Sequence, residues 1–166
     1  MRNVSSEVDK LSDVSERFPS ADFDIVEAGK CLAFSRGTAC VYHLMRVLER
    51  GLYTLADYLE IEDIQENWQN AIEQIEKTIK ELDNARPSRR ADASVRTEWE
   101  SKRRFCSDAA THFAYVKDAW RNSTVHVSLS RARIYPVEDA QRVYENVKGF
   151  MGILATRLST EPEFES

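Results

Sequence analysis

Apolar side chains recur at steps of three and four residues along most of this chain, and few residues interrupt them. The 166 residues include only five glycines and four prolines. Such spacing gathers apolar residues on one face of an α-helix, and the scarcity of helix-breaking residues predicts long helices. Because no segment of useful length alternates apolar and polar residues, we expect an all-α fold.

The periodic segments correspond to four long helices. We expect them at about residues 22–59, 64–82, 96–121 and 136–158. The first carries two apolar stripes, which indicates contacts on two sides, and Gly29, Gly37 and Gly51 within it indicate close helix approaches or a kink. Connections of modest length favour an antiparallel four-helix bundle with a long first helix.

Composition suits a single globular domain, since 42% of the residues are hydrophobic. We expect the bundle to occupy residues 22–160, after a polar and serine-rich segment, 1–21. Residues 161–166 form an acidic tail that is expected to be disordered. Four apolar residues of the first segment fit a short docked helix: Val8, Leu11, Val14 and Phe18.

The sequence carries no sign of export or membrane insertion. No apolar run approaches the roughly twenty residues of a spanning helix, and the N-terminus lacks a cationic and then apolar signal. The three cysteines, Cys31, Cys40 and Cys106, form no close pair, which is typical of buried free thiols in a reducing cytoplasm. We therefore expect a cytoplasmic protein without a disulfide, metal site or cofactor.

Charge is unevenly distributed along the chain. The net charge is −5, yet the segment from Arg86 to Arg104 holds seven basic residues against three acidic ones, a local balance of +4 that leaves the rest near −9. Two interpretations are open: the segment steers a polyanion such as RNA, or it is a solvated linker.

The hexapeptide from Arg121 to His126 contains the side chains that could cleave RNA without a metal. Histidine titrates near neutral pH and can move the proton of a ribose 2′-hydroxyl, and arginine offers a planar fork to phosphate oxygens. Five residues along an unbroken helix rotate by about 140°, which would separate the two side chains. Ser123, Thr124 and Val125 form helices poorly, so we expect the helix to end or distort here and let them converge.

Other histidines and motifs have ordinary interpretations. Arg36 and His43 form a second arginine–histidine pair, seven residues apart, which we interpret as a helix surface or interface. His112 is interpreted as a core or interface histidine that Asp108 could hold by a hydrogen bond. The Glu-x-x-His pairs of di-iron proteins and the glycine cluster of a phosphate-binding loop are both lacking.

With the segment from Lys117 to His126, the chain resembles the HEPN superfamily, whose signature is Arg, a polar residue that is often Asn, a short spacer and His. The resemblance implies a metal-independent endoribonuclease that cleaves RNA through 2′-hydroxyl attack, with Arg121 and His126 as catalytic residues. Asn122 would orient the histidine or a phosphate oxygen. DNA specificity is not expected. Four further arginines are expected to bind the RNA: Arg89, Arg90, Arg131 and Arg133.

The resemblance also implies a homodimer in which two copies of the motif form one composite cleft, and a role as a toxin, abortive-infection or stress defence protein. In a toxin subgroup, a tyrosine two residues after the histidine is modified by a partner enzyme. Ser128 stands at that position here, so an antitoxin acting by tyrosine modification is not expected. The alternative function is a non-catalytic, dimeric helical module that binds another protein.

Overall fold

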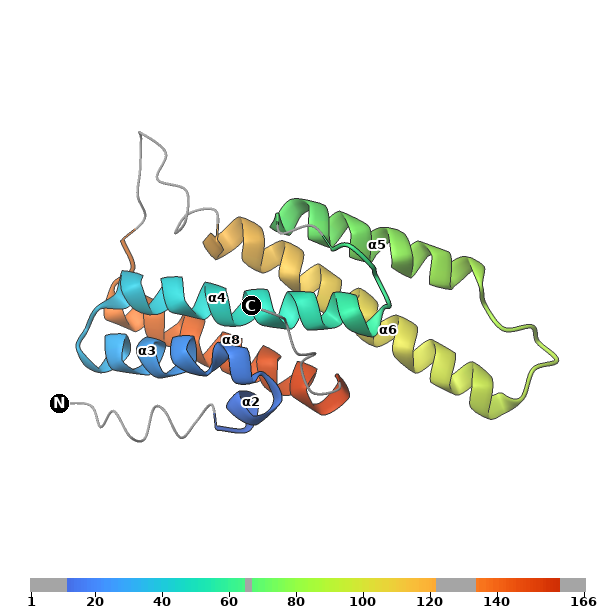
Figure 1. Cartoon of the computed structure of the whole chain (residues 1–166), viewed down its shortest axis with the longest axis horizontal. Helices are drawn as coiled ribbons and strands as arrows, with labels where there is room; N and C mark the ends of the chain where they lie inside the picture. The colour runs from blue at the N-terminus through green and yellow to red at the C-terminus, as the bar shows by residue number, and fades with distance from the viewer. Residues whose placement is uncertain (1–11, 65–66, 122–133, 159–166) are drawn as a thin grey trace.

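The computed structural model describes residues 12–64, 67–121 and 134–158 (Figure 1). All regular secondary structure in this part of the chain is helical, so the predicted all-α class is confirmed there. The expected tail, 161–166, lies outside the described residues, as do Val8 and Leu11. The helices are α2 (Ser12–Arg17), α3 (Asp22–Ala33), α4 (Gly37–Tyr58), α5 (Trp68–Asn84), α6 (Ala93–Val116) and α8 (Val137–Arg157), with a 3₁₀ turn at Pro19–Ala21 and a π-helical turn at Lys117–Arg121.

The prediction of one long first helix is wrong, because the chain reverses direction between α3 and α4. Arg36 N–H donates to Cys31 O at 2.7 Å and Ser35 N–H donates to Leu32 O at 3.1 Å. This pair of bonds is a Schellman motif, which satisfies the last carbonyls of α3. Ser35 takes the left-handed conformation that the motif requires, with φ of 57°. Since glycine usually fills that position, serine there gave no stop signal in the sequence.

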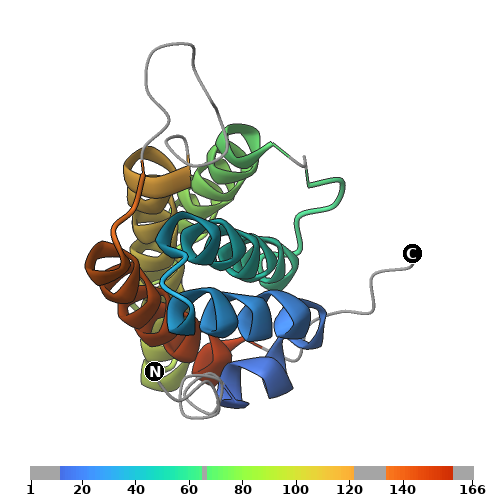
Figure 2. The ribbon, with the colours of Figure 1, turned by 90° about the vertical axis from the view of Figure 1, so that its left-hand side faces the viewer.

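Helix α4 lies at the centre of the molecule, with α3, α5 and α8 packed around it (Figure 2). Its apolar residues are therefore buried on several sides by the same chain. The two stripes expected on the first helix are explained by this packing and do not require a second copy of the chain. Buried on α4 are Cys40, Val41, Leu44, Met45, Val47, Leu48, Leu52, Leu55 and Ala56.

Helix α5 begins at Trp68, later than predicted, because the residues before it favour a turn. The side chain of Asn67 accepts the backbone N–H of Gln69 at 2.8 Å, which caps the new helix. Helices α5 and α6 then pack against each other as a hairpin (Figure 1). The Trp99 indole of α6 donates to Leu82 O of α5 at 3.2 Å, which fixes the two helices near the connection between them.

Two of the expected close approaches are confirmed. A Cβ added at Gly37 would lie 2.1 Å from Tyr135 O, and one added at Gly51 would lie 2.9 Å from side-chain atoms of both Leu154 and Met151. Gly37 thus lets the segment before α8 pass directly over the first turn of α4. Val14 and Phe18, two of the four apolar residues noted in the N-terminal segment, are buried in the core. None of the described helices is long and apolar enough to cross a membrane.

Candidate functional site

The described part of the predicted motif is the π-helical turn that ends α6. Residues Lys117–Arg121 leave the α-helical hydrogen-bond pattern, and such single π-turns are frequent at functional sites. The helical pattern thus changes from Lys117 onwards, whereas the weak helix formers that prompted the prediction of a distortion lie outside the described residues. The side chain of Arg121 and the whole of Asn122 and His126 lie outside the described residues.

Contacts on both sides attach the segment 122–133 to the bundle. Before it, the Lys117 ammonium contacts Gln69 of α5 and pairs with Asp118 at 3.4 Å, while Trp120 packs against the core. The π-helical turn also contacts α4. After it, Tyr135 N–H donates to Thr38 Oγ1 on α4 at 3.0 Å. The two attachments of the segment that carries His126 are thus fixed by α4, α5 and α6. Arg131 and Arg133 belong to this segment and also lie outside the described residues.

Arg89 and Arg90 are exposed in the connection between α5 and α6, at the far end of α6 from Arg121 (Figure 1). Since α6 has 24 residues, the two regions are separated by about 36 Å along the helix. The structure therefore places Arg89 and Arg90 far from Arg121 of the same chain.

A cavity of about 480 Å³ lies at this α5–α6 turn. Its walls include the side chains of Arg86, Arg89, Arg96 and Trp99. Arg86 lies over the Trp99 ring at 5.6 Å and 3.6 Å from Glu100. Arginine and aromatic groups around an open cavity can accept a phosphate and a base.

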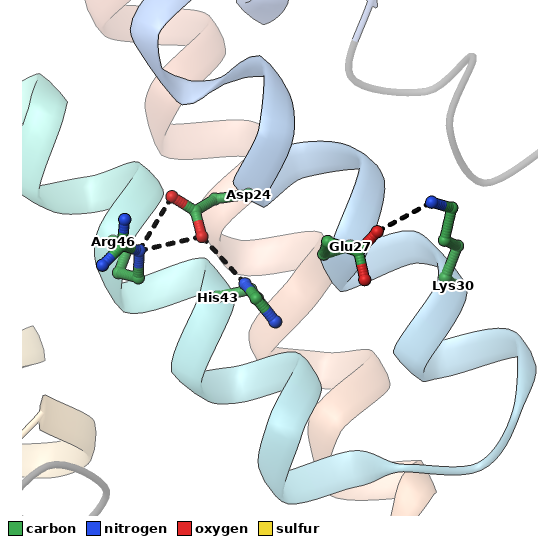
Figure 3. Close-up of polar contacts among 5 residues, drawn as sticks. All are labelled: Asp24, Glu27, Lys30, His43 and Arg46. Carbon is green, nitrogen blue, oxygen red and sulfur yellow. Dashed lines mark hydrogen bonds and ion pairs between the residues drawn. The ribbon is translucent and has the colours of Figure 1, made fainter.

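A polar cluster on α3 and α4 has more complete geometry and was not found from the sequence. Asp24 of α3 is 3% exposed, and its carboxylate points across to His43 and Arg46 of α4 (Figure 3). Asp24 Oδ1 lies 2.8 Å from His43 Nδ1, and Arg46 Nε donates to both carboxylate oxygens at 2.9 Å. The hydrogen bond that Arg46 donates to the Asp24 carboxylate raises the pKa of Arg46 above its ordinary value.

The cluster opens toward solvent through its two basic side chains. The side chains of His43 and Arg46 are 20% and 48% exposed, against 5% for Asp24. Because Nδ1 of His43 is hydrogen-bonded to the carboxylate, Nε2 is the ring nitrogen that faces away from Asp24. The rings of Phe23 and Tyr42 flank His43 edge-on, with centroids at 6.3 Å and 5.7 Å.

The predicted interface role of His43 is therefore confirmed, but its partners are Asp24 and Arg46. Arg36, the partner considered in the sequence, precedes the first residue of α4, so the two do not share the face of one long helix. The spacing of His43 and Arg46, three residues apart, would have been a useful signal once the reversal before Gly37 was known.

His112 is half-buried and stacks on Phe150 with a centroid distance of 3.9 Å, as expected of a core histidine. Burial lowers its pKa, and a side-chain hydrogen bond with Asn146 opposes the decrease. The partner is thus Asn146 and not the expected Asp108. Its Nε2 is buried and has no hydrogen-bond partner among the described residues.

Cys31, Cys40 and Cys106 are buried free thiols, as the sequence predicted. Burial raises the pKa of Cys106 to about 11, which keeps this thiol protonated and unreactive. Within residues 12–64, 67–121 and 134–158, no three His, Cys, Asp or Glu side chains are placed to hold a metal ion. No protein-family model, curated protein or solved structure matches this chain.

Proposed function

We propose that this chain is a metal-independent endoribonuclease of the HEPN type. The observation that carries the proposal is the position of the hexapeptide from Arg121 to His126, which starts on the last residue of the π-helical turn after α6. A break in the helical pattern is what two side chains five residues apart need in order to converge. Anchoring of both flanking segments on α4 adds support, because catalytic residues on a connection need a rigid base.

In the proposed reaction, His126 takes the proton from a ribose 2′-hydroxyl or gives a proton to the leaving 5′-oxygen. Attack of the 2′-oxygen on phosphorus breaks the bond to the 5′-oxygen and leaves a 2′,3′-cyclic phosphate. Arg121 stabilises the negative charge that builds on the phosphate oxygens, and Asn122 orients His126 or one of those oxygens. Hydrogen bonds and charge suffice for this chemistry, so the proposal requires no metal.

The proposal extends to the architecture and the assembly. We take α4, α5, α6 and α8 as an antiparallel four-helix bundle with α3 added against α4. We also propose that two copies associate so that two motifs form one cleft. The buried free thiols support a location in a reducing cytoplasm. A toxin or defence role, with an antitoxin as protein partner, belongs to the same proposal.

Cleavage of a 5′-labelled RNA in the presence of EDTA tests the activity. Purified protein should yield fragments that end in a 2′,3′-cyclic phosphate, and light scattering should report about twice the 19.1 kDa chain mass. Arg121→Lys should retain little of the parent's activity, because an ammonium cannot reproduce the bidentate fork of a guanidinium. A folded protein that leaves RNA intact in EDTA, and equally with added Mg²⁺, would remove the ribonuclease proposal.

Arg89 and Arg90 are proposed to bind RNA phosphates outside the cleavage site, together with Arg131 and Arg133. Replacing Arg89 and Arg90 by Ala should reduce the slope of log affinity against log salt by about 0.7 for each lost contact with single-stranded RNA. Folding should not change, because both side chains are exposed. Replacing Lys77 and Lys80 of α5 by Ala provides the control for a loss of two cations elsewhere. An unchanged slope would favour the solvated-linker interpretation.

The second candidate is a non-catalytic, dimeric helical module. The specific observation in its favour is the number of large apolar side chains left exposed on the described surface, among them Phe23, Phe34, Tyr115 and Ile153. A stable dimer that binds RNA weakly and cleaves none would favour this function.

A further inference from the structure

The buried carboxylate of Asp24 on α3 holds two partly exposed basic side chains of α4, His43 and Arg46. An ion pair buried between helices is weak evidence for stability, since apolar residues of similar size often serve as well. Asp24 is nonetheless buried where it can hold two basic side chains in fixed orientations at the edge of solvent. The arrangement therefore prepares His43 and Arg46 for a ligand outside the protein.

Aromatic side chains stand directly beside these basic groups. Phe23 is 66% exposed and Tyr42 is 43% exposed, although each ring also contacts His43. Two exposed rings next to an arginine are typical of surfaces that bind single-stranded nucleic acid, where bases stack on aromatic rings and arginine contacts phosphate. Phe34, at the other end of α3, is exposed to a similar degree, at 64%.

We propose that the face formed by Phe23, Tyr42, His43 and Arg46 binds one nucleotide unit of a single-stranded RNA. Arg46 and His43 contact the phosphate, and Phe23 or Tyr42 stacks on the base. Asp24 is a positioning residue that is shielded from the ligand by the two basic side chains. Glu27 and Lys30, one turn further along α3, form an ion pair of 2.7 Å with each other (Figure 3).

This inference rests on the proposed RNA substrate, but it concerns recognition and not the cleavage step. Its test therefore uses a labelled 2′-O-methyl oligoadenylate of eight nucleotides, which lacks the attacking hydroxyl and cannot be cleaved by the proposed reaction. Binding is measured by fluorescence anisotropy on the full chain. AMP, adenosine and inorganic phosphate serve as competitors, because a free nucleotide and a nucleotide unit of RNA offer the same chemistry.

Phe23→Ala and Tyr42→Ala should each weaken binding by roughly 5- to 100-fold, the effect of losing one stacked base. Phe34→Ala is the matched control, with the same substitution at the same exposure, and should bind as the parent does. Arg46→Lys keeps a charge for Asp24 but loses the fork, and should weaken binding by about tenfold. AMP should displace the labelled oligonucleotide better than adenosine or phosphate does. If AMP binds more tightly than the oligonucleotide itself, a free nucleotide is identified as the ligand.

Equal binding by Phe23→Ala, Tyr42→Ala and Phe34→Ala would overturn the proposal and leave the cluster as a lock between two helices. Absence of oligonucleotide and AMP binding to the parent would also overturn it. Either result would leave the proposed ribonuclease standing if the parent cleaves unmodified RNA in EDTA. Loss of cleavage as well would show that the proposed function itself has failed.

Discussion

The α3–α4 and α5–α6 hairpins each contain an ion pair between their two helices, and the two pairs differ in burial. In the first, Asp24 is buried and its carboxylate is shared by His43 and Arg46. In the second, Arg103 and Asp83 pair at 2.5 Å, with side chains that are 44% and 39% exposed. Buried groups depend on one another, because an unpaired charge there has no water to replace its partner. Surface charges can be lost singly and remain accessible to ligands.

The largest effect is expected at the turn of the first hairpin. Gly37→Ala should lower the free energy of unfolding by about 3 kcal/mol, because the new Cβ would meet the Tyr135 carbonyl and the backbone must move. Urea denaturation measures the loss. Gly51→Ala is the control on the same helix, where only flexible side-chain ends are in the way, and a change within about 1 kcal/mol is expected. Equal losses would mean that the tight passage over Gly37 is not rigid.

The two ion pairs provide a direct test of the comparison. Arg46→Ala should lower the free energy of unfolding by about 2 kcal/mol, since Asp24 is left buried with His43 alone. This value is below that of a fully buried pair because Arg46 is itself half exposed. Arg103→Ala should give no measurable change in the same urea titration. Similar losses for both variants would contradict the distinction between the two hairpins.

A stabilising change is expected at the reversal itself. Ser35→Gly should raise the free energy of unfolding by about 1 kcal/mol, because Ser35 occupies the left-handed position of the Schellman motif at φ of 57°. Glu60 ends α4 in the same way, with φ of 57° and a hydrogen bond from Ile61 N–H to Ala56 O at 3.0 Å. Glu60→Gly should therefore stabilise similarly in thermal melts. Destabilisation by both variants would contradict the assigned backbone geometry.

A smaller and pH-dependent effect is expected from His112 on α6. Its folded-state pKa lies below the ordinary histidine value of about 6.5 because burial disfavours the charged ring. The unfolded chain therefore binds the proton more readily, so stability should decrease as the pH falls below about 6.5 and level off below the folded pKa. Urea titrations at pH 7.5 and 5.5 measure the difference. His112→Gln should reduce that difference, and an unchanged pH dependence would assign it to other groups.

The sequence predicted the helices better than their connections. Periodic apolar residues predicted α5 and α6, and the helix expected from about residue 136 begins at Val137 as α8. The reversal after α3 was missed because its left-handed residue is a serine, stabilised by the contacts of the two helices it joins. A helix can be predicted from the local spacing of its apolar residues, whereas such a turn depends on tertiary packing.

The same limit applies to the candidate sites. Arg121 and His126 are near in sequence, so a local motif was enough to suggest them. Asp24 and His43 are 19 residues apart and meet only because the chain reverses between them. The cluster therefore could not be predicted while α3 and α4 were taken as one helix. Residues that combine only through the fold require the fold to be known.

Single-turnover cleavage of labelled RNA in EDTA tests the central claim most directly. His126→Ala should cleave about 10²- to 10⁴-fold more slowly than the parent, the usual cost of losing an acid or base. Arg121→Ala should fall comparably, while Arg36→Ala, the arginine of the other arginine–histidine pair, should cleave at the parent rate. Thermal melts must show each variant folded, since a destabilised variant imitates an inactive one. A folded, dimeric His126→Ala that cleaves RNA at the parent rate would contradict the account.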